Sequence, residues 1–376
     1  MEFNDLLKKM VKAGASDMFV TAKLPVSAKI NGELHPIDTD VLTPEQSLAL
    51  VHLSMNNKQR RVFDEKKECN YAIYVDDIGR FRISAFWQRD MAGMVLRRIV
   101  TEIPDVDQLG LPPVLKDIVM SKRGLVLFVG GTGSGKSTSM ASLIGYRNKN
   151  AYGHILTIED PIEFIHEHGK SMITQREVGL DTDSFDAALK SSLRQAPDVI
   201  LIGEIRSQET MEYALSFAET GHLCIATLHA NNANQAIDRI MHLVPAEQHD
   251  KLLFDLSLNL RGIIAQQLIP AKDGQSRIAA IEILLNSPYV AELIKRGDIA
   301  EIKEAMNKSK ELGMQTFDQA LFNLYNEGLI TYTDAIHHAD SPNDLRLMIK
   351  LRSNDQSDIS ALSGITIEGL ESDDEM

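Results

Sequence analysis

The chain has 376 residues, 53 acidic and 39 basic, and its formal net charge of −14 argues against non-specific nucleic-acid binding as its main activity. A hydrophobic content of 44% is typical of a soluble globular protein, and the length predicts two or three domains. Cys69 and Cys224 are the only cysteines, which excludes a disulfide framework and a thiolate metal site and suits a reducing cytosol.

Residues 1–100 are predicted to form a small α+β domain. The chain opens with a short amphipathic helix, and apolar and polar residues then alternate through 17–37 as in a β-hairpin. Residues 43–55 begin with a threonine and a proline, which are favoured at the N-cap and the first position of a helix. Residues 69–99 predict three antiparallel strands joined by two short turns that contain Asp and Gly.

A proline-rich stretch, residues 101–113, is predicted to link this domain to the next. From 114 to 351, short apolar runs alternate with helical segments, which is typical of an α/β domain with a buried, mostly parallel sheet. The runs are GLVLFVG, HILTIED, SMITQRE, DVILIGE, HLCIATLH and RIAAIEILL. Residues 352–376 are rich in Ser, Asp and Glu, and we expect an acidic disordered tail there, as a solvated terminus rather than a docking segment.

The strongest motif is a phosphate-binding loop in the stretch GLVLFVGGTGSGKSTSMASLIGY. It matches the template G-x-x-x-x-G-K-[ST], with a predicted strand before it and a predicted helix after it. The glycines let backbone amides point at phosphate oxygens, the lysine directs a positive charge toward the β- and γ-phosphates, and the serine hydroxyl is a ligand for Mg²⁺. The predicted residues for binding a nucleoside triphosphate are Gly130, Gly131, Thr132, Gly133, Ser134, Gly135, Lys136, Ser137 and Thr138.

A carboxylate for hydrolysis is expected at the end of the strand in DVILIGE. Open α/β sheets bind ligands at the carboxyl ends of their strands, which brings Glu204 to the crevice of the phosphate-binding loop. Gly203 stands where an ordinary second nucleotide-binding motif has Asp, so Mg²⁺ is expected to depend on Ser137, on water and, as a further candidate, on Glu204. Glu204 is the leading candidate for orienting or deprotonating the attacking water, with a strand-end cap or surface ion pair as the alternative.

Three more carboxylates follow the strand in HILTIED, namely Glu159, Asp160 and Glu163. Asp160 with the following proline is a common turn, and one carboxylate here is expected to be structural. Glu159 or Glu163 is a candidate for steering water or the metal ion.

Two histidines, seven residues apart, flank the apolar segment LCIATL. If the segment is a strand, seven steps of about 3.3 Å place His222 and His229 about 23 Å apart and on opposite faces, so they cannot share a metal ion. A helix would align them, but the segment is short and follows Gly221 in a domain of buried strands. We therefore expect His229, with Thr227, at the carboxyl end of the strand near the γ-phosphate, whereas spacing gives His222 no comparable role.

These motifs together resemble those of the type II/type IV secretion ATPases. In chain order, GGTGSGKST, TIEDPIEF, DVILIGEIR and TGHLCIATLHANNA are similar to the family's Walker A motif, Asp box, Walker B motif and His box. GASDMFVTAKLP and GRFRISAF are similar to its N-terminal domain, so the resemblance covers nearly the whole chain. The size, without a long N-terminal extension or a tetracysteine zinc site, resembles the pilus retraction branch, and its PilU-like members most.

The resemblance implies a PAS-like α+β domain followed by a RecA-like P-loop ATPase domain, assembled as a homo-hexamer that uses ATP and Mg²⁺. It also implies roles for individual residues, which are Glu204 as the Walker B glutamate, Glu163 as the active acid of the Asp box, and His222 and His229 as the His-box pair.

The resemblance further implies that arginines of the N-terminal domain reach the nucleotide of a neighbouring subunit. The matching residues are Arg82 and Arg97, with Arg80 and Arg98 as alternatives. A cation supplied across a subunit joint stabilises charge on the leaving phosphates and couples hydrolysis to domain rotation. Without the resemblance, these residues would be interpreted as surface cations on two strands.

The function implied is an ATP-hydrolysing motor that powers type IV pilus retraction, as an accessory partner of a paralogous retraction ATPase at the inner-membrane platform protein of the pilus. Residues 284–302 keep the helical spacing of the family's AIRNLIRE segment but not its arginine pattern, which argues against retraction by this chain alone. An adaptor that stabilises a partner ring with little turnover is the alternative; a nucleic-acid translocase is disfavoured by the net charge of −14.

The sequence also bears on where the protein is expected to be located. There is no recognisable signal peptide and no apolar run of the roughly 18 residues that a membrane span needs. We therefore expect a cytoplasmic protein that reaches the inner membrane only through the pilus machinery.

Overall fold

The computed structural model describes residues 2–30, 32–99, 102–274 and 276–352, which group into two compact units. One unit contains Met1–Asp105 and Ala141–Pro197, and the other contains Val106–Met140 and Asp198–Met376. The units therefore interleave along the chain, and the predicted domain boundaries stay predictions. Apart from its first residue, the predicted tail at 352–376 lies outside the described residues.

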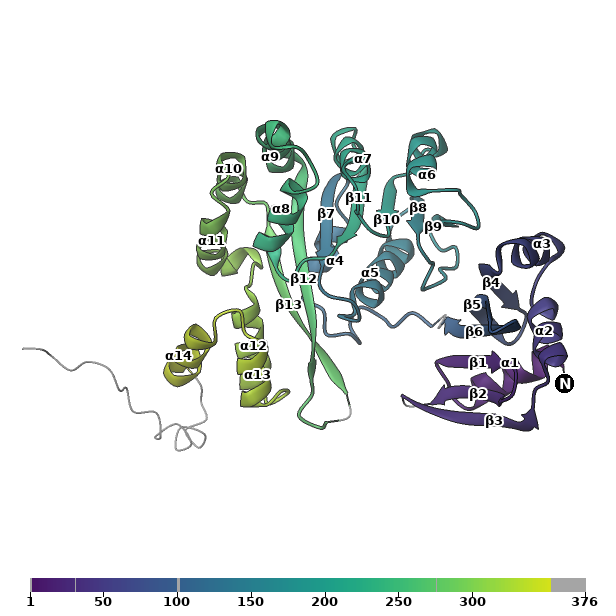
Figure 1. Cartoon of the computed structure of the whole chain (residues 1–376). Helices are drawn as coiled ribbons and strands as arrows, with labels where there is room; N and C mark the ends of the chain where they lie inside the picture. The colour runs from purple at the N-terminus through teal and green to yellow at the C-terminus, as the bar shows by residue number, and fades with distance from the viewer. Residues whose placement is uncertain (1, 31, 100–101, 275, 353–376) are drawn as a thin grey trace, which may run out of the picture. The chain divides into compact units, whose positions relative to one another are not determined.

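In the first unit, the described residues form a six-stranded antiparallel sheet with the order β3-β2-β1-β6-β5-β4. Helix α2 packs on β1 and β6, as Figure 1 shows. The predicted α+β architecture is confirmed. The strands are β1 (Asp17–Thr21), β2 (Pro25–Ile30), β3 (Glu33–Val41), β4 (Glu68–Val75), β5 (Gly79–Gln88) and β6 (Met91–Ile99), and the helices are α1 (Phe3–Lys12), α2 (Pro44–Leu53) and α3 (Asn57–Lys66).

Two of these helices begin with reciprocal side-chain caps. Thr43 Oγ1 accepts from the backbone N–H of Gln46, and Gln46 Oε1 accepts from that of Thr43, which confirms the predicted start of α2. Asn56 and Gln59 cap α3 in the same way. Helix α3 was not predictable from its sequence, because only Phe63 among its ten residues is buried and the segment has little apolar periodicity.

The later part of the first unit adds a parallel pair of strands, β8 (Gly153–Glu159) and β9 (Ser171–Glu177), and helix α6 (Phe185–Ser192). Both strands occupy predicted apolar runs. A short 3₁₀ turn, Leu193–Gln195, follows α6.

In the second unit, five strands lie in the order β13-β12-β7-β11-β10. Strands β12, β7, β11 and β10 are parallel to one another, and β13 is antiparallel to β12. Every residue of β7, β10 and β11 is buried, which explains their uninterrupted apolar sequences. The strands are β7 (Gly124–Val129), β10 (Val199–Ile202), β11 (Leu223–Leu228), β12 (Leu260–Pro270) and β13 (Arg277–Leu285).

Helices surround this part of the sheet, with α7 packed against β7 and β11 and α8 against β12 and β13 (Figure 1). The three helices α12, α13 and α14 pack on one another. No helix among the described residues is long and apolar enough to cross a membrane. The α-helices are α4 (Val114–Val119), α5 (Lys136–Asn150), α7 (Gln208–Glu219), α8 (Ala233–Met241), α9 (His249–Asn259), α10 (Pro288–Arg296), α11 (Ile302–Lys308), α12 (Phe317–Asn326), α13 (Tyr332–His338) and α14 (Pro342–Arg352), with 3₁₀ turns at Ala246–Gln248, Ile299–Glu301 and Lys310–Leu312.

Candidate nucleotide-binding site

The predicted phosphate-binding loop joins β7 to α5 and adopts a backbone that requires glycine. Gly130, Gly133 and Gly135 have φ angles of 149°, 76° and 86°, which L side chains rarely adopt. A Cβ on Gly130 would lie 2.5 Å from the carbonyl oxygen of Gln266, and one on Gly135 would lie 2.7 Å from its Nε2. The glycine spacing of the motif therefore reflects both backbone conformation and close approach of β12.

Lys136 is the residue around which the loop folds. Its Nζ donates to the carbonyl oxygens of Gly130 and Gly131 at 2.7 and 2.8 Å and lies 3.4 Å from Ser134 Oγ. Lys136 and Ser137 are also the first two residues of α5, where backbone N–H groups have no acceptor within the helix. An anion at this point would meet the ammonium group, the positive end of the helix and the loop amides together.

The strand register brings the other predicted motifs to the same edge of the sheet. Val129 pairs with Leu228, so the loop after β7 and His229 after β11 leave the sheet side by side. Ile202 pairs with Ala226, so the Glu204 loop leaves β10 at this edge as well. Because parallel strands share their carboxyl ends, Glu204 and His229 lie at the same edge of the sheet as the loop after β7.

Glu204 is held by a cation and a histidine. Arg206 Nε donates to Glu204 Oε2 at 2.6 Å, and His229 Nε2 lies 3.2 Å from Glu204 Oε1. The Glu204 side chain is 17% exposed, whereas that of His229 is 50% exposed. The carboxylate is thus oriented on both oxygens yet open to solvent, as a group that positions a water molecule must be. Arg206 was not among the predicted site residues, although it stands two residues after Glu204 in GEIR.

Thr227 fixes the loop that carries Glu204. Its Oγ1 donates to the carbonyl oxygen of Gly203 in a short hydrogen bond, and its own carbonyl oxygen accepts from the N–H of Ile205 at 2.9 Å. The hydroxyl was expected near the γ-phosphate together with His229. The structure instead commits the hydroxyl to the carbonyl oxygen of Gly203, because the side chain is buried between adjacent strands.

We expect Thr227→Val to slow ATP hydrolysis about tenfold, because a small misplacement of a catalytic group is costly. Valine keeps the shape but removes the bond to Gly203, which costs about 1 kcal/mol of stability. Phosphate release and urea unfolding measure the two effects. Thr227→Ser retains the hydroxyl and is the matched control; equal turnover by Thr227→Val and the parent would show that this bond does not position Glu204.

His222 lies at the opposite end of β11 from His229. Its carbonyl oxygen accepts from Gly124 N–H at 3.0 Å, and its Nδ1 lies 3.2 Å from the carbonyl oxygen of Phe217. The segment between the two histidines is a strand, as predicted, so they lie at its opposite ends. These contacts give His222 a place at the end of α7, and a catalytic role for it stays a prediction.

The Asp-box residues belong to the first unit and differ in exposure. Burial raises the pKa of Glu159 to about 7, although Thr157 Oγ1 at 2.6 Å and Gln175 Nε2 at 3.2 Å both donate to its Oε1. Glu163 is exposed. Of the two candidates, Glu159 is therefore the half-buried carboxylate held by two side-chain donors, and Glu163 is the exposed one.

The candidate arginines occupy neighbouring strands of the N-terminal sheet. Arg82 on β5 and Arg97 on β6 are directly opposite each other and exposed. Arg97 Nε donates to Asp17 Oδ1 at 2.8 Å, but its side chain remains 71% exposed. Like charges that face each other across two strands are destabilising, so this pair is suited to an anion from outside.

The alternative Arg80 is engaged within its own chain. Its Nη2 donates to Glu177 Oε2 at 3.2 Å, and the same oxygen accepts from Ile162 N–H. Glu177 is buried, so removing the arginine would leave a buried carboxylate with one donor fewer. The geometry favours Arg82 and Arg97 over Arg80 as the residues offered to another molecule.

The oxygen ligands at this edge of the sheet suit a Mg²⁺ ion that is held mainly by phosphate oxygens and water. Mg²⁺ keeps several water ligands and uses few protein ligands in nucleotide sites. Ser137 supplies a hydroxyl at the start of α5, and Glu204 supplies a carboxylate whose oxygens also contact Arg206 and His229. The described residues include no group of three or more His, Cys, Asp or Glu side chains that could hold a metal ion by itself.

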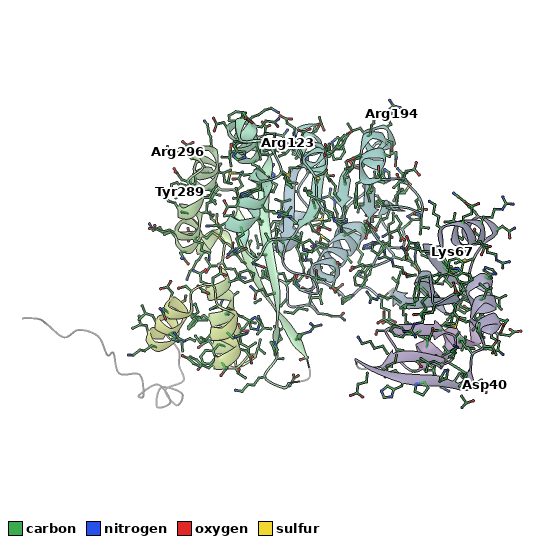
Figure 2. The ribbon with its side chains drawn as sticks, viewed as in Figure 1. Asp40, Lys67, Arg123, Arg194, Tyr289 and Arg296 are labelled. Atoms are coloured by element: carbon green, nitrogen blue, oxygen red, sulfur yellow. The ribbon has the colours of Figure 1, made fainter. Side chains whose placement is uncertain are left out.

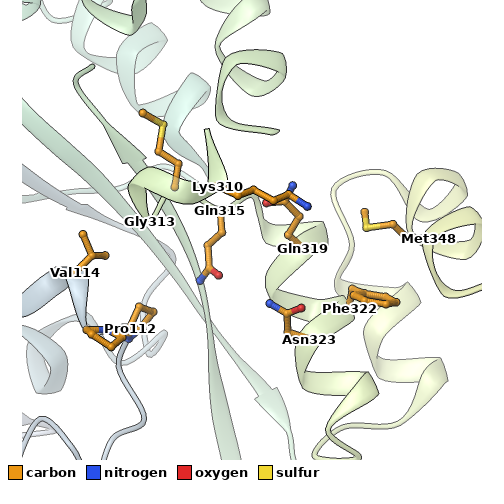
Figure 3. A pocket seen from close by; sticks show the side chains of 11 residues that line it. Pro112, Val114, Lys310, Gly313, Gln315, Gln319, Phe322, Asn323 and Met348 are labelled. Carbon is orange, nitrogen blue, oxygen red and sulfur yellow. The ribbon is translucent and has the colours of Figure 1, made fainter. Parts of the chain in front are cut away.

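A separate pocket of about 510 Å³ lies between the start of α4 and helices α12 and α14 (Figure 3). Pro112, Val114, Gln319, Phe322 and Met348 are among its lining residues. The lining contains one charged side chain and no carboxylate, so we assign it no part in phosphate chemistry.

Comparison with known proteins agrees with this geometry. A family model described as "Type II/IV secretion system protein" matches residues 2–319. The chain belongs to this family. It is 60% identical over 370 residues to the type IV pilus ATPase PilU of Pseudomonas aeruginosa, covering 98% of this chain and 96% of that protein. It is 42% identical to the type IV pilus retraction ATPase PilT of the same organism, covering 91% and 99% of the two chains.

The fold agrees as well. A crystal structure of the pilus retraction motor PilT with bound ADP superposes with a TM-score of 0.87 at 40% identity, covering 93% of this chain and all of the other. The predicted class, an antiparallel N-terminal sheet followed by a mostly parallel α/β sheet of the PilT type, is confirmed, and so is the predicted membership of the PilT/PilU-like group.

Proposed function

We propose that this chain is an ATP-hydrolysing motor that drives type IV pilus retraction. The observation that carries the proposal is the Glu204 carboxylate, held by Arg206 and His229 at the sheet edge from which the Lys136 loop also leaves. Relatives named as pilus ATPases, at up to 60% identity, supply the biological setting.

In the proposed reaction, the loop amides and Lys136 bind the β- and γ-phosphates of ATP, and Lys136 exchanges its carbonyl acceptors for phosphate oxygens. Glu204 accepts a hydrogen bond from the attacking water and takes its proton, while Arg206 and His229 keep the carboxylate in place. Mg²⁺, when bound, neutralises phosphate charge, with Ser137 as a protein ligand. Glu163, as the exposed acid of the Asp box, is proposed to act on the same water or metal ion.

We propose further that the working form is a homo-hexamer in which Arg82 and Arg97 of one subunit reach the nucleotide of the next. Their exposure and their opposition across β5 and β6 support this arrangement. Charge that develops on the leaving phosphates then depends on a neighbouring subunit, which couples hydrolysis to movement between subunits.

Arg82→Ala and Arg97→Ala are each expected to lower turnover about 10³-fold, the contribution typical of an arginine supplied across an interface. Lys29→Ala is the control, because Lys29 is an exposed cation on β2 and lies opposite Asp17 in the same sheet. We expect this variant to hydrolyse ATP at the parent rate. Phosphate release by the purified assembly is the measurement.

Mixing the variants tests whether the arginines act between subunits. Subunits with Arg82→Ala keep an intact Lys136 loop, and subunits with Lys136→Ala keep intact arginines, so mixed assemblies are expected to regain activity. Absence of any recovery in mixtures that assemble normally would place Arg82 in its own subunit's site.

The role as an accessory to a paralogous retraction ATPase is also a proposal. In the segment 284–302, helix α10 carries basic residues only in its last turn, Lys295 and Arg296. Tyr289 and Arg296 point outward from this helix in Figure 2. We propose that this segment is a surface for a partner at the platform protein of the pilus. Through such contacts the chain would be located in the cytoplasm at the inner membrane. Nucleic acid is not among the proposed partners.

Pilus retraction in piliated cells tests this function. Cells in which this chain is the only intact retraction ATPase are expected to retract poorly, and addition of the paralogue is expected to restore forceful retraction that Lys136→Ala abolishes. Normal retraction force with the Lys136→Ala chain present would support the alternative, an adaptor that needs no turnover of its own.

A further inference from the structure

A buried carboxylate on β13 joins the starts of two helices. Glu282 has no exposed surface, and its Oε1 accepts from the N–H of Ala233 at 2.8 Å while its Oε2 accepts from the N–H of Phe317 at 3.3 Å. Ala233 begins α8 and Phe317 begins α12. One side chain thus fixes the start of α8 relative to the C-terminal helices.

The residue before Ala233 is fixed by a second carboxylate. Asn232 accepts from Gln235 N–H as the N-cap of α8 and donates through Nδ2 to Asp340 Oδ2 at 3.3 Å. Asp340 also forms a close ion pair with Lys303. Asn234 donates to the carbonyl oxygen of Ile299. The residues on either side of Ala233 are therefore both hydrogen-bonded to the region 299–340.

The segment held in this way is the short loop 229–232 between β11 and α8. At its beginning His229 contacts Glu204 at 3.2 Å, and at its end the N–H of Ala233 contacts Glu282. Only three residues, 230–232, lie between His229 and Ala233, so a very short stretch of backbone joins the two contacts.

A buried carboxylate is costly for stability unless it has donors, and Glu282 has two backbone donors, with Lys303 as a nearby cation and Asp340 as a nearby like charge. Burial raises the pKa of Glu282 to about 7. The group is not part of the hydrolysis chemistry described above. Glu282 instead connects the start of α8, next to the His229 loop, to the start of α12.

We propose that Glu282 is a positioning residue that transmits the arrangement of the C-terminal helices to His229 and Glu204. The proposal rests on the proposed function, since it assigns Glu282 to the hydrolysis step of the same site. A partner that displaces α12 or α14 would act on turnover through Glu282, without contact with the nucleotide.

Glu282→Gln tests the proposal, because an amide of the same shape keeps one acceptor and turns a donor toward the other N–H. In the full-length assembly, we expect kcat to fall about 10- to 100-fold, as for a misplacement of about 1 Å, while ATP affinity changes less than about threefold. Phe317→Leu is the matched control, since it disturbs packing at the same helix start but leaves the backbone N–H bonded to Glu282.

Measuring kcat, ATP affinity and unfolding in urea for both variants distinguishes a positioning role of Glu282 from a role in stability alone. If Glu282→Gln and Phe317→Leu are equally destabilised in urea and only Glu282→Gln loses kcat, the proposal holds. It is overturned if Glu282→Gln keeps the parent kcat, or if both variants lose kcat in proportion to stability. Glu204→Gln, run alongside, keeps the outcomes distinct, because its full activity would contradict the proposed function and not this inference alone.

Discussion

Lys136→Ala is expected to abolish ATP hydrolysis and to weaken ATP binding about 10- to 100-fold, the range set by a lost charge-assisted hydrogen bond of about 1.5–3 kcal/mol. The ammonium group bonds to the carbonyl oxygens of Gly130 and Gly131 and is the one mobile cation of the loop template. Fluorescent-nucleotide binding and phosphate release measure both effects.

The matched control for this variant is Lys149→Ala. Lys149 lies on the same helix, is 70% exposed and pairs with Asp105 at 3.4 Å, so its loss changes the charge equally without touching the loop. Lys149→Ala should bind and hydrolyse ATP as the parent does. Parent-like turnover by Lys136→Ala would mean that the loop is not the site of phosphate chemistry.

Glu204→Gln is expected to lower turnover about 10²- to 10⁴-fold, the usual contribution of a general base, and to leave ATP binding intact. Glutamine retains the shape and can still contact His229, but it cannot take a proton and loses the charge that pairs with Arg206. Rapid-quench hydrolysis together with nucleotide binding separates the two steps.

Glu209→Gln is the control for charge, since Glu209 is an exposed carboxylate five residues further on in the first turn of α7. We expect it to have no effect on turnover. If Glu204→Gln hydrolysed ATP at the parent rate, Glu204 would be a strand-end carboxylate with a structural role only.

The parts of the site that lie within one loop or one strand were predictable from the sequence. The phosphate-binding loop has its own signature, and the strands before it and before Glu204 are uninterrupted apolar runs. Since these strands are parallel neighbours, their carboxyl ends meet at one edge, and Glu204 and His229 were expected there for that reason.

Contacts between distant segments were not predictable. Strand β12 was missed because Gly262 and two glutamines interrupt its apolar pattern, although it packs directly on the loop glycines. Glu282 and Ala233 are 49 positions apart, and nothing in local spacing indicates that they bond. Thr227 was expected at the nucleotide because it lies on the correct strand, but its hydroxyl donates to the carbonyl oxygen of Gly203, just after the end of β10.

The central claim is that this chain hydrolyses ATP at the Lys136 loop by means of Glu204. Steady-state phosphate release by the purified full-length protein, alone and with a paralogous retraction ATPase, tests it most directly, with ATP binding measured in the same samples. We predict release by the parent and release at least about 100-fold slower by Glu204→Gln, with ATP bound by both. Tight ATP binding without phosphate release from the parent under either condition would contradict the claim and leave the adaptor in its place.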